Sequence, residues 1–276
     1  MKRNWPEGKH IAVLFTIMFE GWEEGAAPGV GPMGNALKPG YYDTANAGWA
    51  KYAANNGLER QLKILKEEGI KASVFCSGVQ MECHPDLIKK IAAEGHEVCL
   101  HSLAQNIIPI YLDEATEREQ MSHCLDLAVS LTGKHPVGYC SPRCTPSLST
   151  SKLLAENGLK YTIDWMGSDL PMVEHTEAGD ICLMPFPMNV NDMPLYVRYG
   201  NAPDQYYRNL VDEFENWYAK HPEEKVVYWV TAHSHVFGRP FGAVQFQRCI
   251  QYIKSLPYVW IAQPHEVAST VLDVTY

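Results

Sequence analysis

Short apolar runs alternate with amphipathic helical patterns along nearly the whole chain, and this alternation limits the possible folds more than any other feature. The apolar runs are rich in β-branched and aromatic residues and are bounded by turn residues or charges, which is typical of buried strands. They cover residues 11–19, 72–76, 97–101, 137–141, 161–165, 181–185, 226–232 and 259–263. Such an alternation predicts parallel β-α-β units.

Helical patterns fill most of the stretches between these runs, at residues 49–68, 86–94, 114–131, 147–156, 204–220 and 241–255. Several of them stop at or near a glycine, such as Gly69 or Gly133, and glycine suits the left-handed residue that often ends a helix. Seven or eight β-α units in 276 residues fit a barrel better than an open doubly wound sheet. We therefore predict one α/β domain over residues 1–276, built as a distorted (β/α)7-8 barrel.

Residues 23–48 interrupt the alternation with a long stretch rich in glycine and proline. We predict a functional loop or an arm at an oligomer contact here, because long irregular loops in a compact domain usually have such a role. Residues 29–34 read GVGPMG, a literal GxGxxG. A dinucleotide fingerprint lies directly between a strand and a helix. Here nine residues separate it from the first strand and Pro39-Gly40 follow it, so we reject a nucleotide site.

Charge and composition limit the kinds of partner that we expect for this protein. The net charge is −9 and the basic residues form no stripe, which argues against a nucleic-acid partner. The N-terminus lacks the apolar core of about 7–15 residues that a signal peptide needs. The longest apolar run is also far shorter than the roughly 20 residues that span a bilayer. We expect a cytoplasmic protein without a membrane partner, and the loop at 23–48 suggests a homo-oligomer.

The chain has eight cysteines and no CxxC pair. In a reducing compartment these are expected to be free thiols that pack as small apolar side chains. Cys140 and Cys144 flank only three residues, which leaves a reactive pair as an alternative. Buried, inert thiols are the interpretation we favour.

Polar and ionisable residues follow almost every predicted strand. In a β/α barrel these positions meet at one rim, where the active site lies. They are Glu20, His101 with Gln105 four residues later, Arg143, Asp164, Asp169, Asn191, Asp192, His233 and His235. A carboxylate, imidazoles and a guanidinium together supply the base, acid and cation that hydrolysis requires.

Five segments in order along the chain carry a family resemblance: GHEVCLH at 95–101, GYCSPR at 138–143, LAENG at 154–158, SDLP at 168–171 and TAHSHVFGRP at 231–240. This ordered set resembles the polysaccharide deacetylase superfamily from residue 11 to about residue 268. The resemblance implies a (β/α) barrel, often seven-stranded, that hydrolyses an amide. In the sugar deacetylases, an Asp and the two His of an HxxxH pair hold a divalent metal, with a second Asp as base and a late His as acid.

The sequence departs from that pattern twice. Gln105 replaces the second histidine of HxxxH, and the first strand ends in Phe19-Glu20-Gly21-Trp22 without tandem aspartates. Zinc prefers anionic or imidazole ligands to a neutral amide oxygen. These features resemble a branch that includes allantoinases and cyclic-imide hydrolases, some of which work without a tightly bound metal. Two alternatives stay open: one divalent metal such as zinc held by Glu20 and His101, or no metal.

We predict a hydrolase of non-peptide C–N bonds whose partner is a small cyclic or linear amide of the imide or ureide type. Glu20 is expected as base or metal ligand, His101 to orient water or metal, and His233 as acid. The predicted substrate-binding residues are Trp22, Gln105, Arg143, Asp169, Asn191, Asp192 and His235. The alternatives are a metal-dependent N-acetyl-sugar deacetylase and a non-catalytic family member. For Arg143 an ion pair with Asp164 or Asp169 is the structural alternative, and for Asp192 a turn cap.

Overall fold

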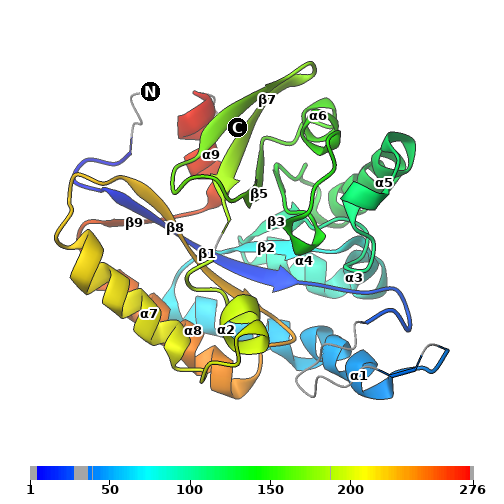
Figure 1. The fold of residues 1–276 in the computed structure, drawn as a ribbon, viewed down its shortest axis with the longest axis horizontal. Coiled ribbons are helices and arrows are strands. Elements are labelled where there is room, and N and C mark those ends of the chain that lie inside the picture. The colour runs from blue at the N-terminus through cyan, green and yellow to red at the C-terminus, as the bar shows by residue number, and fades with distance from the viewer. Residues whose placement is uncertain (1–4, 28–36, 39, 187, 274–276) are drawn as a thin grey trace.

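The computed structural model describes residues 5–27, 37–38, 40–186 and 188–273, and its centre is a curved nine-stranded sheet (Figure 1). The strands are β1 (Ile11–Phe19), β2 (Ser73–Cys76), β3 (Glu97–Leu100), β4 (Gly138–Tyr139), β5 (Tyr161–Trp165), β6 (Met172–Thr176), β7 (Gly179–Pro185), β8 (Val226–His233) and β9 (Val259–Ala262). Their order is β6-β7-β5-β4-β3-β2-β1-β8, with β9 beside β1. All pairings are parallel except that of β6 with β7.

Strand β1 lies next to the edge strand β8, and every one of its residues is buried. On one side it pairs with β8 from Ile11–Val226 to Met18–His233. On the other side its first half pairs with β9 and its second half with β2. An isolated bridge between Asn191 and Thr231 joins the segment after β7 to β8. The predicted distorted barrel is therefore confirmed, with its seam between β7 and β8.

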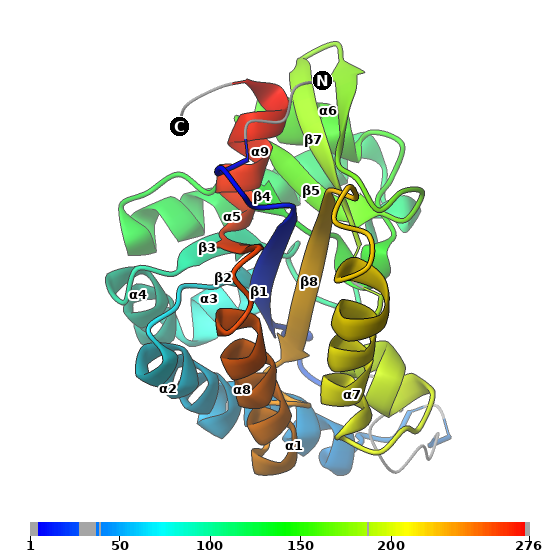
Figure 2. The ribbon, with the colours of Figure 1, turned by 90° about the vertical axis from the view of Figure 1, so that its left-hand side faces the viewer.

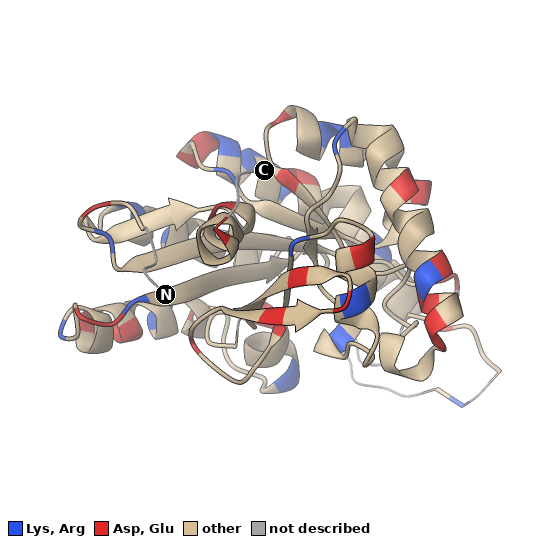
Figure 3. Ribbon diagram, turned by 90° about the horizontal axis from the view of Figure 1, so that it is seen from above, with Lys and Arg blue, Asp and Glu red and all other residues tan. Residues whose placement is uncertain are grey.

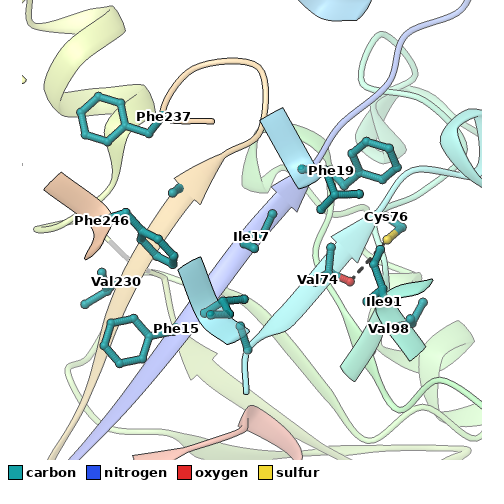
Figure 4. Packing of buried hydrophobic residues seen from close by; sticks show 14 of the residues in the cluster. Phe15, Ile17, Phe19, Val74, Cys76, Ile91, Val98, Val230, Phe237 and Phe246 are labelled. Atoms are coloured by element: carbon teal, nitrogen blue, oxygen red, sulfur yellow. Dashed lines mark hydrogen bonds between the residues drawn. The ribbon is translucent and has the colours of Figure 1, made fainter. Parts of the chain in front are cut away.

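Helices cover the outside of the sheet. They are α1 (Thr44–Tyr52), α2 (Leu58–Glu68), α3 (Gly78–Cys83), α4 (Pro85–Ala93), α5 (Glu114–Thr132), α6 (Thr150–Glu156), α7 (Gln205–Glu213), α8 (Pro240–Lys254) and α9 (Pro264–Leu272). Helices α2, α8 and α7 lie side by side over β1 and β8 (Figure 2). The apolar layer beneath them includes Phe15, Val230 and Phe246 (Figure 4). Burial of an aromatic side chain such as Phe15 or Phe246 contributes about 1.5–3 kcal/mol to the free energy of folding.

A second apolar cluster fills the inside of the barrel and shows the two-residue period of strands. Leu14 and Met18 of β1, Cys99 of β3 and Trp229 of β8 belong to it. Because alternate strand residues share a face, the same alignment brings Glu20, His101 and His233 to the inside, at or just past the ends of their strands. The apolar filling below them thus fixes which way the polar residues at the rim point.

The predicted elements are present, with corrections at several ends. Helix α1 begins at Thr44, inside the predicted loop 23–48, and a π-helical turn, Ala53–Gly57, joins it to α2. The predicted helix 204–220 ends in a second π-helical turn, Phe214–Tyr218. Helices α3 and α9 and strand β6 were not predicted; β6 is only partly buried. Gly69 and Gly133 are left-handed as predicted. The GVGPMG stretch lies outside the described residues.

Positions of Lys and Arg are interspersed with positions of Asp and Glu along the ribbon in Figure 3. Ion pairs such as Lys90–Glu59 and Arg118–Glu156 join neighbouring helices. Within the described part of the chain, no helix combines the length and the apolar character needed to cross a membrane.

Candidate active site

The carboxylate of Glu20 lies among three histidines at the top of the barrel. Its Oε1 atom is 3.3 Å from His101 Nε2 and 3.6 Å from His233 Nε2, and its Oε2 atom is 3.7 Å from His235 Nε2. Glu20 follows β1, His101 follows β3, and His233 and His235 lie at or just after the end of β8. The carboxyl ends of these parallel strands thus bring the three predicted catalytic residues together with His235. We call Glu20, His101, His233 and His235 the rim cluster.

The backbone around Glu20 is held firmly. Gln80 of α3 donates to the Glu20 carbonyl at 2.6 Å, and the Gly21 amide donates to Ser77 Oγ at 3.2 Å. A Cβ atom on Gly21 would lie 2.6 Å from Val79 Cγ2, so glycine permits this close approach of α3. Gln105 is buried and its side-chain amide donates to the same Ser77 hydroxyl at 3.3 Å. The side-chain partner that the structure gives Gln105, predicted as substrate-binding, is thus Ser77.

His101 is oriented from the side opposite Glu20. Its Nδ1 lies 2.7 Å from the carbonyl oxygen of Cys140. A carbonyl only accepts hydrogen bonds, so Nδ1 carries a proton and Nε2 faces the carboxylate. The residue after β4 thereby fixes a side chain from the end of β3.

Asp192 orients His233. Its carboxylate is fully buried and lies 2.6 Å from His233 Nδ1, and it also accepts from the amides of His233 at 2.9 Å and Phe237 at 3.0 Å. We predicted Asp192 as a substrate-binding residue; this is corrected, because these three donors occupy its oxygens. The sequence placed Asp192 after a strand, but its partner stands 41 residues away and no local pattern pointed to it.

Opposite charges in the rim cluster stabilise the ionised forms of Glu20, His101 and His233. Burial alone would raise the pKa of Glu20, but the charge of His233 and hydrogen bonds from His101 and His233 hold that pKa well below its ordinary value. Burial would lower the pKa of His233, but Asp192 and Glu20 raise it to about 10. For His101, contacts with Cys140 and Glu20 likewise outweigh burial and raise the pKa to about 10. At neutral pH the carboxylate therefore lies between two imidazolium groups.

His235 is the neutral member of the rim cluster. Burial lowers its pKa to about 3. Its ring meets Trp22 and Trp49 edge to face, at centroid distances of 5.3 and 4.3 Å. Neither ring nitrogen of His235 has a hydrogen-bond partner within the described structure. Trp22 was predicted as a site residue; Trp49 was missed, because it stands in a helix with no strand-end signal.

The side chains of the rim cluster have little exposure to solvent. The side chain of Glu20 is 10% exposed, that of His233 6% and that of His101 3%, while His235 is fully buried. Charged groups at this depth interact more strongly than on a surface, since little solvent screens them.

Three other predicted site residues lie apart from the rim cluster or point elsewhere. Arg143 is exposed and left-handed (φ 56°), and it forms no ion pair with Asp164 or Asp169, all three being described residues. Asp169 is exposed beside Tyr218 in a separate cavity of about 120 Å³ at the seam. Asn191 is buried and its side chain accepts from the Met193 amide at 3.0 Å.

The rim cluster fits a catalytic metal poorly. Such a zinc site needs three protein ligands around the ion. Glu20 and His101 offer two donor atoms 3.3 Å apart. Adding His233 or His235 gives no set whose ligand atoms all lie within 4.8 Å of one another, although all these residues are described. The third expected position holds Gln105, whose amide is engaged with Ser77.

Residues 40–162 match the polysaccharide deacetylase family model. The crystal structure of Puue allantoinase is 28% identical and superposes with a TM-score of 0.86, covering 97% of this chain and 92% of that one. A peptidoglycan deacetylase of Helicobacter pylori is 24% identical over 80% of this chain and 85% of its own length.

A peptidoglycan deacetylase-like protein of Gibberella zeae is 32% identical over 60% of this chain, and the match spans 48% of that relative, about half its length. The family model and the barrel fold both point to a polysaccharide deacetylase domain. Residues 40–162 therefore form a polysaccharide deacetylase domain, whose family consists of hydrolases that act on carbon–nitrogen bonds, and the likeness to Puue allantoinase extends the same fold over nearly the whole chain.

Proposed function

We propose that this protein hydrolyses a small cyclic or linear amide, of the imide or ureide type, with Glu20 as general base and His233 as general acid. The observation that carries the proposal is the depth of the acid–base pair. Side-chain exposures of 10% for Glu20 and 6% for His233 suit a compact ligand that enters a closed site. A polymer would need an open groove.

The reaction begins with a water molecule beside Glu20. The carboxylate takes a proton from the water as its oxygen attacks the amide carbonyl carbon. His233, held protonated by Asp192, gives its Nε2 proton to the nitrogen as the C–N bond breaks. That proton is needed because an unprotonated amine anion is a poor leaving group. Afterwards Glu20 is protonated and His233 neutral, and their atoms 3.6 Å apart allow the proton to return.

His101 is a positioning residue in this scheme. Its imidazolium lies 3.3 Å from the Glu20 carboxylate and keeps the base ionised and aimed. Trp22 and Trp49 form an aromatic wall behind His235. No step is assigned to a metal, because the donor set does not fit one.

A metal-dependent N-acetyl-sugar deacetylase is the second candidate. It is favoured by the likeness to the Helicobacter pylori relative, a peptidoglycan deacetylase that matches most of this chain. Gln105 in the third ligand position argues against it.

The test is a substrate panel assayed with and without a chelator: succinimide, hydantoin, allantoin and an N-acetylglucosamine oligomer. We expect turnover of a small amide that survives chelation. Deacetylation of the sugar, lost with chelator and restored by zinc, would establish the second candidate instead. Inactivity on every substrate, with and without zinc, would favour the non-catalytic alternative. A cytoplasmic location and a homo-oligomeric state remain parts of this proposal, to be tested by fractionation and sedimentation.

A further inference from the structure

Two thiols and a carboxylate meet beside the rim cluster, in a group that the proposed reaction does not use. One ligand atom from each of Cys140, Cys144 and Asp164 lies within 4.8 Å of the other two. The Cys140 sulfur is 3.5 Å from Asp164 Oδ1. Cys140 and Asp164 come from the ends of β4 and β5, and Cys144 from the turn that follows β4.

We propose that Cys140, Cys144 and Asp164 form a binding site for a thiophilic divalent cation, with zinc as the natural probe, distinct from Glu20 and His101. Zinc bonds of about 2.3 Å to sulfur and 2.1 Å to oxygen at a tetrahedral angle place those two atoms about 3.6 Å apart. The observed 3.5 Å between Cys140 and Asp164 matches that separation. Thiolate and carboxylate ligands also suit zinc far better than the Gln105 amide does.

The carboxylate is already held as a metal ligand should be. Asp164 accepts from the Ser141 amide at 3.0 and 3.1 Å and from the Thr162 hydroxyl at 2.9 Å. Hydrogen bonds of this kind orient ligating carboxylates and are worth about 10–100-fold in metal affinity. Asp164 therefore needs no rearrangement to offer an oxygen to the ion.

Cys144 and Asp164 are the more exposed of the three proposed ligands. Cys140 is 1% exposed, whereas Cys144 is only partly buried and follows the exposed Arg143. An ion would arrive from the Cys144 side, and each thiol would release its proton to the buffer as its sulfur binds. Three protein ligands leave a fourth position for water, as tetrahedral zinc allows.

The proposed cation site lies close to the catalytic residues, which affects how a measured metal content is interpreted. The Cys140 carbonyl fixes His101, so the proposed cation would lie next to the catalytic residues without being ligated by them. One zinc per chain in the purified protein would then not identify a catalytic metal. This inference does not rest on the proposed hydrolysis, because binding is measured without any substrate.

The experiment is zinc titration of the reduced protein by calorimetry, paired with alkylation of cysteines read by mass spectrometry. We expect one zinc per chain in wild type, in Glu20→Gln and in the matched control Cys83→Ser, which alters an exposed thiol. Cys144→Ser should abolish binding, and Thr162→Val should weaken it about 10–100-fold. In wild type, zinc should protect Cys144 from alkylation but not Cys83.

Three results would overturn the proposal. The first is the absence of zinc binding in wild type. The second is binding lost in Glu20→Gln but kept in Cys144→Ser. The third is binding removed by His221→Ala, since His221, Glu223 and Glu224 are the other described set with close ligand atoms. The alkylation result in wild type decides the matter even if Cys144→Ser fails to fold.

Discussion

Replacing Asp192 with Asn tests the link between a buried carboxylate and the acid of the reaction. The pKa of His233 is raised from 6.5 to about 10, which corresponds to about 5 kcal/mol of preference for the charged ring. Burial opposes that shift, and Asp192, 2.6 Å away, is its largest support. Removing the negative charge favours the neutral ring, so the pKa of His233 should fall toward 6.5.

Two measurements follow from that change. In Asp192→Asn, the alkaline limb of kcat/KM should move to lower pH, because the acid form of His233 is lost earlier. The maximal rate should drop about 10³–10⁴-fold, as when an Asn misorients a catalytic His by stabilising the wrong tautomer. Nuclear magnetic resonance of ¹⁵N-labelled histidines reads the His233 pKa and tautomer directly, without substrate.

A surface pair provides the matched control. His175 and Asp180 also lie 2.7 Å apart, but their side chains are 79% and 54% exposed. Asp180→Asn should leave activity and stability nearly unchanged, since such pairs are worth about 0–1 kcal/mol. If His233 titrates at the same pH in Asp192→Asn as in wild type, Asp192 does not hold the acid in its charged form and the reasoning is refuted.

Two further predictions concern stability. A Cβ on Gly57 would lie 1.9 Å from the Ser234 carbonyl, so Gly57→Ala should cost about 1–3 kcal/mol by overpacking. Gly48→Ala, in open space on α1, should stabilise by about 0.5–1 kcal/mol; equal effects in denaturant unfolding would contradict this difference. The raised pKa of His233 contributes stability that is complete below pH 6.5 and is lost as pH rises through about 10. The free energy of unfolding should therefore fall across that window, and a flat profile would show that His233 is not coupled to folding.

Strand-end residues were predictable because two simple rules combine. Parallel strands place their carboxyl ends at one rim, and the two-residue period sets which side chains face inward. Glu20, His101 and His233 satisfy both rules. Asp169 satisfies only the first, since the chain beyond β5 leads it to the seam beside Tyr218.

What the sequence did not reveal depends on contacts between distant segments. Asp192 meets His233 across the gap between β7 and β8, where the described residues form one isolated bridge between the two segments. Trp49 reaches His235 because the π-helical turn Ala53–Gly57 brings α1 over the loop after β8. Neither contact leaves a periodic or local signature. Strand β6 was missed for another reason: its partly exposed residues, MVEHT, lack the long apolar run that marked the buried strands.

The measurement that tests the proposed function most directly is kcat/KM for the best small-amide substrate, in chelator-treated wild type and in Glu20→Gln. We predict that chelation leaves the wild-type rate unchanged and that Glu20→Gln lowers it about 10²–10⁴-fold, the usual contribution of a general base. Gln keeps the shape of the side chain, so that loss would report the missing base. Full activity in Glu20→Gln, or wild-type activity that vanishes on chelation and returns with zinc, would contradict the proposed metal-free reaction.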